Sequence, residues 1–220
     1  MKNLLQSILP LFFPEHCVGC KKRGEILCTL CVAQARHAER ETTRHTIAGF
    51  DYREPVIKNA LWELKYKKKK HIAKVLGEEL YERTLEEISN IRIFGAGRPI
   101  LIIPIPLSKA RMRERGYNQA ELLAKAFIKN AEENVFELRT DILTKGKDTP
   151  PQARIANRNK RLQNIKGAFS FHKNFNPNEI QGRTIIVVDD ITTTGGTLTE
   201  AMQMFEKAGA KKVVGCAVAH

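Results

Sequence analysis

The sequence lacks any long hydrophobic run. Across its 220 residues, the longest apolar stretch is far shorter than the roughly 18 residues that a membrane-spanning helix needs. Residues 3–13 are apolar, but Pro10 interrupts them, Pro14 closes them, and no small-residue cleavage site follows. These features argue against a secretory signal peptide and favour a short amphipathic helix. We therefore expect a cytoplasmic protein with reduced cysteines; attachment at the periphery of the inner membrane stays open.

Acidic residues are also scarce, and the only low-complexity stretch is a run of lysines. Hydrophobic residues at 42% and charged residues at 28% are ordinary, but 24 acidic residues against 37 basic ones give a formal net charge of +13. A basic surface suits polyphosphate substrates, single-stranded nucleic acid or acidic membranes, although charged runs also line ordinary solvated faces. The 6 histidines and the scattered aromatic residues offer no clear platform for stacking bases, which weakens sequence-independent strand binding.

Cysteines are few, but four of the 5 form two C-x-x-C knuckles with seven residues between them. In a reducing compartment this spacing predicts metal chemistry before disulfides. Two knuckles supply four thiolates in a closed tetrahedral set, which structural Zn²⁺ prefers; an iron–sulfur cluster or a redox pair is the alternative. Cys216 falls in a predicted buried strand and is expected to be a core residue. The predicted metal ligands are Cys17, Cys20, Cys28 and Cys31.

Hydrophobic patterning predicts two parts of unequal size. Residues 1–45 form an N-terminal helix, the four-cysteine module and a charged linker, and residues 46–220 alternate strands with helices. Such alternation predicts a parallel sheet flanked by helices, with any ligand at the carboxyl ends of the strands. The expected strands are 46–52, 100–105, 135–143, 165–171, 185–188 and 212–218, and the expected helices are 55–64, 72–91, 119–134 and 198–208.

The densest chemical signal lies at residues 185–197. A β-branched buried strand ends in Asp189 and Asp190, a loop of hydroxyl residues and glycines follows, and a helix begins near Thr197. Loop amides, hydroxyls and a helix N-terminus together suit a phosphate. The carboxylates would repel that phosphate unless a ribose diol or a divalent cation lay between them. The loop lacks the endings of a P-loop or a dinucleotide fingerprint; an ordinary strand–turn–helix is the alternative.

A second dense signal connects another strand end to a helix start. Residues 104–107 close an aliphatic strand, and residues 113–120 lead into a helix. Arg113 and Arg115 could meet pyrophosphate oxygens with forked hydrogen bonds. Asn118 and Gln119 could position a substrate or cap the helix. Taken alone, the segment is equally compatible with a surface turn.

Residues 187–197 resemble the phosphoribosyl-pyrophosphate (PRPP) motif of type I phosphoribosyltransferases. Nearly the whole chain resembles the ComF family, because the four cysteines and further motifs occur in the same order along the sequence. These further motifs lie at residues 64–66, 104–120, 149–152 and 161–169. Members of this family are competence-associated relatives of the amidophosphoribosyltransferases. The resemblance implies a type I phosphoribosyltransferase-like α/β fold, with the small zinc module at its N-terminus. It also implies a role in natural transformation and the handling of incoming single-stranded DNA.

The resemblance also implies roles for individual residues. The paired acids bind the ribose hydroxyls of PRPP with Mg²⁺, the loop holds the 5-phosphate, and Lys65 and Tyr66 lie where type I enzymes have their pyrophosphate loop. Thr149, Gln152 and Arg158 correspond to the mobile loop that closes over PRPP. A solvated lysine and an ordinary surface loop are the respective alternatives. The implied PRPP-binding residues are Asp189, Asp190, Thr192, Thr193, Thr194, Gly195, Gly196, Thr197, Lys65 and Tyr66.

The sequence departs from the family pattern at two places. Lys145 and Lys147 stand where arginines are frequent, and lysine keeps the charge but loses the bidentate fork. Thr193 stands where some purine-salvage relatives have an aspartate that deprotonates the base, and a hydroxyl of ordinary pKa is a poor general base. Purine salvage of that kind is therefore not expected, and the acceptor stays unidentified.

Two classes of function remain open. The first is a phosphoribosyltransferase that displaces pyrophosphate from C1 of PRPP, with Lys65, Arg113 and Arg115 as candidate catalytic residues. The second is a non-catalytic PRPP-sensing or single-strand-binding module of the transformation machinery. Candidate partners are PRPP, single-stranded DNA, and a competence helicase or uptake-channel proteins. A glutamine-amidotransferase-like enzyme would need a catalytic cysteine at a mature N-terminus or a partner subunit, and no cysteine is so placed.

Overall fold

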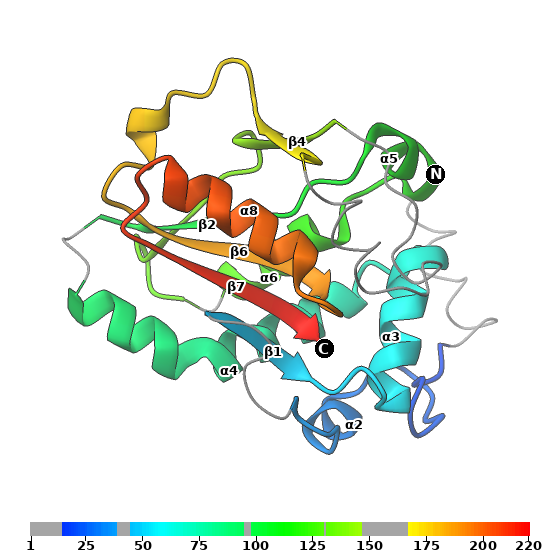
Figure 1. Ribbon diagram of the computed structural model, residues 1–220. Helices are drawn as coiled ribbons and strands as arrows, with labels where there is room; N and C mark the ends of the chain where they lie inside the picture. Colours follow the sequence, from blue (N-terminus) through cyan, green and yellow to red (C-terminus); the bar gives the residue numbers. More distant parts are fainter. Residues whose placement is uncertain (1–14, 39–44, 95–97, 130, 147–166) are drawn as a thin grey trace, which may run out of the picture.

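The computed structural model describes residues 15–38, 45–94, 98–129, 131–146 and 167–220. Over these residues the chain builds a five-stranded parallel sheet in the order β1-β7-β6-β2-β3 (Figure 1). A two-stranded antiparallel sheet, β4-β5, lies beside it. The strands are β1 (Thr46–Phe50), β2 (Ile100–Pro104), β3 (Phe136–Leu138), β4 (Leu143–Lys145), β5 (Phe169–Phe171), β6 (Thr184–Ile191) and β7 (Lys212–Ala219). The helices are α2 (Thr29–Ala33), α3 (Pro55–Tyr66), α4 (Ile72–Phe94), α5 (Lys109–Arg115), α6 (Gln119–Lys129), the 3₁₀ turn η2 (Pro177–Glu179) and α8 (Gly196–Lys207).

The central strands are buried on both faces, as their aliphatic runs predict. Alternate residues of β2 enter two different cores: Ile100 and Ile102 pack with α3, α4 and α6, whereas Leu101 and Ile103 pack with α8. Figure 1 shows α8 crossing one face of the sheet. The predicted parallel sheet flanked by helices is confirmed, and Cys216 is fully buried in β7, as expected.

The predicted strand at 135–143 is wrong as a single element. Its first part is β3, which pairs with β2 in the main sheet, and its last part begins β4, which pairs with β5. The chain bends between them, where the Arg139 guanidinium donates two hydrogen bonds to Asp141, from Nε to Oδ1 at 2.8 Å and from Nη2 to Oδ2 at 2.9 Å. The predicted helix at 119–134 ends earlier, at Lys129, and Asn134 adopts a left-handed φ of 64° that no α-helix can contain.

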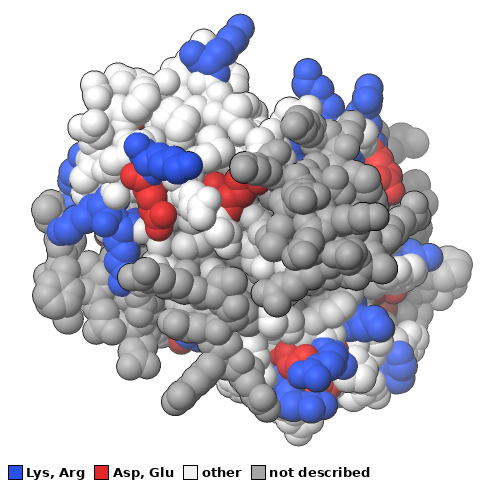
Figure 2. All heavy atoms as spheres, viewed as in Figure 1, with Lys and Arg blue, Asp and Glu red and all other residues white. Residues whose placement is uncertain are grey.

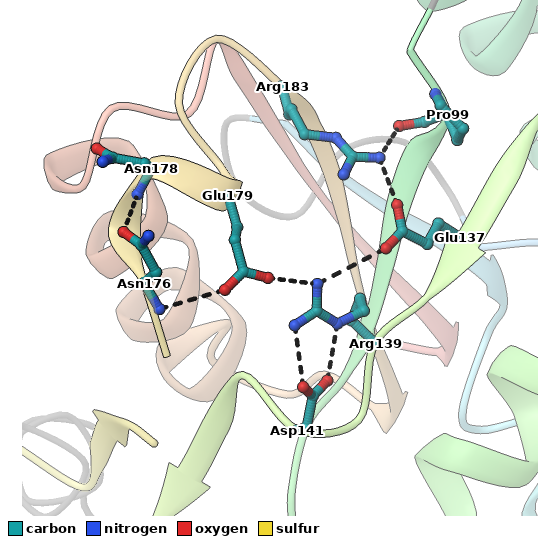
Figure 3. Close-up of polar contacts among 8 residues, drawn as sticks. All are labelled: Pro99, Glu137, Arg139, Asp141, Asn176, Asn178, Glu179 and Arg183. Carbon is teal, nitrogen blue, oxygen red and sulfur yellow. Dashed lines mark hydrogen bonds and ion pairs between the residues drawn. The ribbon is translucent and has the colours of Figure 1, made fainter. Parts of the chain in front are cut away.

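The bend belongs to a larger network of charged side chains (Figure 3). Arg139 Nη1 also contacts Glu179 of η2 at 2.7 Å, and Arg183 Nη2 donates to Glu137 and to the Pro99 carbonyl at 2.8 and 2.6 Å. The Arg139 contact holds the pKa of Glu179 below its usual value. The network therefore joins the β3 edge, the turn toward β4 and the segment before β6.

The four-cysteine segment packs onto the body of the protein. Its buried aliphatic side chains join the same core as α3, and Glu15 contacts the Lys69 ammonium at 2.6 Å, beyond the end of α3. His37 forms a β-bridge with Phe50, so the start of the predicted linker runs beside β1. The domain boundary at residue 45 stays a prediction, and the helix expected at 3–13 lies outside the described residues. The buried side chains of the segment are Cys17, Ile26, Leu27, Val32 and Ala35.

Candidate functional site

The loop after β6 lies at the carboxyl edge of the parallel sheet, where α/β proteins bind ligands. Residues 192–195 connect the end of β6 to α8. Gly195 adopts a left-handed φ of 73°, which a glycine takes without steric cost. The Thr192 amide donates to the Ala219 carbonyl at 2.9 Å, which fixes the start of the loop to the end of β7. The end of β6, which contains the two acids, and the loop that follows it therefore lie together at this edge of the sheet.

One of the two adjacent carboxylates forms an ion pair with a lysine. Lys65 Nζ lies 3.0 Å from Asp190 Oδ1, and these side chains are only 15% and 13% exposed. Asp189 Oδ1 accepts the Asp190 amide at 2.8 Å. Burial and the neighbouring Asp190 charge nevertheless raise the pKa of Asp189 to about 7, although Lys65 and Lys145 oppose that rise. The site is therefore short of positive charge, and a cation or a hydrogen-bonding diol would relieve it.

The loop contains buried hydroxyl groups that lack protein partners. Thr192 Oγ1 and Thr194 Oγ1 are both inaccessible to solvent and make no hydrogen bond within the described parts of the chain. Buried polar atoms rarely stay unpaired in folded proteins. Gly195, which precedes α8, has no side chain to cap the first turn of that helix. These donors and the positive end of the helix dipole fit an anionic ligand such as a phosphate.

Of the two residues expected at a pyrophosphate loop, only Lys65 contacts the acid pair. Helix α3 continues two residues beyond its predicted end at residue 64, to Tyr66. The extra residues bring Lys65 to Asp190. The Tyr66 ring is 53% exposed and packs against the side chains of Arg115 and Trp62.

The two arginines of the second signal occupy different environments. Arg113 is exposed on α5, whereas Arg115 is half-buried, with its guanidinium carbon 5.6 Å from the centre of the Tyr66 ring. Arg115 Nη1 donates to Gln119 Oε1 at 2.7 Å. Arg115 Nε and Gln119 Nε2 are buried without a hydrogen-bond partner among the described residues. Arg115 and Gln119 are therefore better placed than Arg113 to offer donors to a bound ligand.

Asn118 and Tyr117 brace the segment. The Asn118 side-chain amide donates to the Ile105 carbonyl at 3.0 Å, and its oxygen accepts the Ala120 amide at 3.1 Å at the start of α6. Of the two roles considered for Asn118, these contacts support the helix cap. The Tyr117 hydroxyl donates to the Leu64 carbonyl and so ties this turn to the end of α3. Sequence reasoning missed that tie, since nothing local relates the two segments.

The expected mobile-loop residues Thr149, Gln152 and Arg158 lie outside the described residues, as does Lys147. Their flanking segments are described. The Gly146 amide donates to the Ala168 carbonyl at 3.1 Å, and the Ala168 amide donates to Glu200 of α8 at 3.0 Å. Lys145 lies near enough to Asp189 for its charge to act on the pKa of that carboxyl. The role of the loop in closing over a ligand stays a prediction.

The four cysteines of the knuckles form a candidate metal centre. Their sulfur atoms all lie within 4.8 Å of one another, with Cys28 Sγ 3.6 Å from Cys17 Sγ and 3.8 Å from Cys20 Sγ. Tetrahedral Zn²⁺ with bonds of about 2.3 Å separates its sulfur ligands by about 3.8 Å, so the arrangement fits zinc. A Cβ at Gly19 would lie 2.7 Å from Cys31 Sγ, so this knuckle has room only for glycine there.

The electrostatics of the cluster also fit a bound cation. Burial opposes ionisation of Cys17, but backbone amides of Cys28, Cys20 and Gly19 outweigh it and lower the pKa of Cys17 to about 6. The neighbouring Cys28 group instead raises the pKa of Cys31 to about 12. Four adjacent thiols thus resist full ionisation unless a cation lies among them. The geometry supports a closed structural site, because all four positions are taken by protein sulfur.

Comparison with known proteins agrees with the fold and with the sequence motifs. Residues 114–220 match the family described as the phosphoribosyl transferase domain. The DNA utilization protein YhgH of Escherichia coli O157:H7 is 27% identical over 206 residues, which cover 90% of this chain and 85% of that protein. Competence protein F of Haemophilus influenzae is 33% identical over 138 residues, 60% of this chain and 58% of that protein. Competence protein ComFC of Bacillus subtilis is 35% identical over 114 residues, 51% of this chain and 41% of that protein.

These findings define a phosphoribosyltransferase-like protein: the matched domain spans β6, its two acids, the loop and α8. Three of the relatives reported above carry names from competence or DNA utilization. The resemblance to the ComF family that the motifs indicate is confirmed: the chain is similar to competence and DNA-utilization proteins and contains a match to the phosphoribosyl transferase domain. Within the described residues, none of the helices combines the length and hydrophobicity needed to cross a bilayer.

Replacing one cysteine tests the metal centre. We expect Cys17→Ser to lower the zinc content below one ion per chain and to destabilise the protein, because three thiolates leave the tetrahedron incomplete. Elemental analysis of desalted protein measures the content. Cys216→Ala is the matched control, since Cys216 lies in β7 and outside the cluster. Full zinc occupancy in Cys17→Ser would contradict the four-thiolate site.

Replacing Asp189 tests the electrostatics of the acid pair. The pKa of Asp189 is about 7 in the folded protein against an ordinary 3.8, so above pH 7 the fold must hold a charge that its surroundings disfavour. We expect Asp189→Asn to raise Tm at pH 8 by a few degrees, and the gain to shrink as the pH falls toward 4. Calorimetric melting across this range measures it.

The control variant for that experiment is expected to change Tm in the opposite direction. The Arg139 side chain lowers the pKa of Asp141, so its charge stabilises the fold above the ordinary pKa. Asp141→Asn should therefore lower Tm at pH 8, and the loss should fade in acid. A wild-type protein that is more stable than Asp189→Asn at pH 8 would contradict the account of the acid pair.

Proposed function

We propose that this protein binds PRPP at the carboxyl edge of its sheet. Asp189 and Asp190 accept hydrogen bonds from the 2- and 3-hydroxyls of the ribose, and the loop at 192–197 takes the 5-phosphate. The observation that carries the proposal is that buried threonine hydroxyls without hydrogen-bond partners directly follow the strand end that contains the two carboxylates. A sugar phosphate provides partners for both sets of groups. Its diol can donate hydrogen bonds to the acids, and its phosphate can accept them from the hydroxyls and the α8 amides.

The acid pair also fits the Mg²⁺ that accompanies PRPP in the resemblance. Carboxylate oxygens are its preferred protein ligands, and burial together with the adjacent Asp190 charge raises the pKa of Asp189, which a bound cation would oppose. Asp189 and Asp190 would hold the ion, directly or through water. When bound, Mg²⁺ supplies positive charge against the oxygens of pyrophosphate.

The residues present favour transfer at C1 of PRPP. The C1–oxygen bond to pyrophosphate breaks, pyrophosphate leaves with that bonding pair, and a nucleophile forms the new bond to C1. The developing positive charge on the sugar is balanced by the nearby carboxylates, while Lys65 and Arg115 offer their charges to the departing pyrophosphate. Thr193 lacks the basicity to deprotonate an acceptor, so the acceptor must bring its own nucleophile or another base.

A second candidate function is binding without catalysis. The protein would then sense PRPP, or hold single-stranded DNA, within a DNA-uptake machine that includes a helicase or channel proteins at the cytoplasmic side of the membrane. The names of its relatives and its net charge of +13 support a nucleic-acid context. Release of pyrophosphate from PRPP across a panel of bases and amines separates the two candidates, since only the enzyme responds to an acceptor.

Removing both acids tests PRPP binding. We expect Asp189→Asn with Asp190→Asn to weaken the affinity for Mg²⁺ and PRPP by about 100-fold or more, because the diol and the cation lose their charged acceptors. Isothermal titration calorimetry measures the affinity, and circular dichroism checks the fold. Asp141→Asn is the control, an aspartate outside the site. Unchanged affinity in the double variant would show that the binding site lies elsewhere.

A further inference from the structure

Two aromatic side chains lie exposed at the end of α3, the helix that also carries Lys65. Trp62 and Tyr66 are one helical turn apart, with ring centroids 5.9 Å apart, and they remain 47% and 53% exposed. In the described part of the chain, the other exposed large apolar side chains are Leu30 and Met112. Two neighbouring aromatic rings in water are uncommon on a surface that has no partner.

Each of the two rings carries a cation over one face. Lys67 Nζ lies 5.3 Å from the centre of the Trp62 ring, and the Arg115 guanidinium carbon lies 5.6 Å from that of Tyr66. Between these two aromatic residues in sequence, Lys65 turns toward the sugar-phosphate site and contacts Asp190. Rings and cations therefore alternate along one short surface, which we name the α3 patch: Trp62, Tyr66, Lys67 and Arg115.

The α3 patch combines the two features by which proteins hold single strands. Base faces stack on aromatic rings, and phosphates contact nearby cations, with no need to recognise a sequence. Basic side chains alone do not mark a partner site here, since they are spread over the face drawn in Figure 2. The paired rings do mark one. The helix expected from the sequence ends at residue 64, so the sequence pattern does not place Tyr66 one helical turn from Trp62.

We propose that the α3 patch binds single-stranded nucleic acid, with Trp62 and Tyr66 stacking on bases and with Lys67 contacting phosphates; Arg115 packs against the Tyr66 ring. The inference rests on the nucleic-acid role considered under the proposed function and assigns that role a surface. It also places the strand next to the sugar-phosphate site, because Lys65 belongs to the same helical turn as Tyr66.

The chain contains 1 tryptophan, so intrinsic fluorescence reports directly on the α3 patch. We expect titration with a 20-nucleotide oligothymidylate, about 20 residues being ample for one site, to quench Trp62 emission in step with binding followed by anisotropy of a labelled strand. Titration with Mg²⁺ and PRPP should leave the emission nearly unchanged. Binding by anisotropy without quenching would overturn the proposal.

Substitutions separate stacking from charge. Trp62→Ala should weaken strand binding by about 5-fold or more, whereas Trp62→Phe should retain most of it. Lys67→Gln should lower the slope of log affinity against log salt by about 0.7, and Trp62→Ala should leave that slope unchanged. Leu30→Ala is the matched control, an exposed apolar residue of α2 that lies outside the α3 patch.

The remaining outcomes are decisive. Unchanged strand binding in Trp62→Ala would show that the α3 patch is not the binding site and that the strand binds another surface. No strand binding in protein that still binds PRPP by calorimetry would overturn this inference and leave the proposed function standing. Equal quenching by thymidine monophosphate at the same nucleotide concentration would show a site for free nucleotides. Loss of self-association in Trp62→Ala by sedimentation, with strand binding intact, would show that a second copy covers the rings.

Discussion

Two adjacent carboxylates at the end of a buried strand are the constraint around which this site is arranged. Burial, and after it repulsion from Asp190, raise the pKa of Asp189, and the Lys65 ammonium on Asp190 offsets only part of the effect. The backbone maintains this arrangement, because β6 lies between β7 and β2 up to Val188, and Asp189 and Ile191 continue to pair with β7. A fold that retains such a cluster has a site suited to a cation and a polar ligand.

Several parts of the structure bring groups to that strand end. Helix α3 brings Lys65 from more than a hundred residues earlier in the chain, and the Tyr117 hydroxyl on the Leu64 carbonyl fixes the end of α3. The four-cysteine segment packs against the other end of α3, where a Cβ at Gly19 would meet Val56 at 3.1 Å. A metal that orders the knuckles would therefore also help to hold the helix that presents Lys65, although the two sites share no ligand.

The types of the main elements could be predicted from the sequence, because aliphatic runs and helical periodicity are local signals. The acid pair and its loop could be predicted for the same reason, since the whole signal lies within residues 185–197. The break between β3 and β4 could not, because it depends on Arg139 meeting Asp141 and, through the fold, Glu179. The end of α6 was likewise missed.

Around the acid pair, too, some features could be predicted from the sequence and others depend on the fold. Resemblance gave Lys65 its place, but only the three-dimensional structure distinguishes half-buried Arg115 from exposed Arg113. It also distinguishes Asn118, which caps a helix, from a ligand-binding residue. The pairing of Trp62 with Tyr66 needed two more residues of α3 than the periodicity indicated.

A crystal structure of the protein with Mg²⁺ and PRPP is the most direct test of the central assignment. The account predicts the ribose hydroxyls on Asp189 and Asp190, the 5-phosphate against the amides and hydroxyls at 192–197, and Thr192 and Thr194 no longer unpaired. PRPP found at another surface, with the loop unchanged and its threonine hydroxyls still without partners, would contradict it.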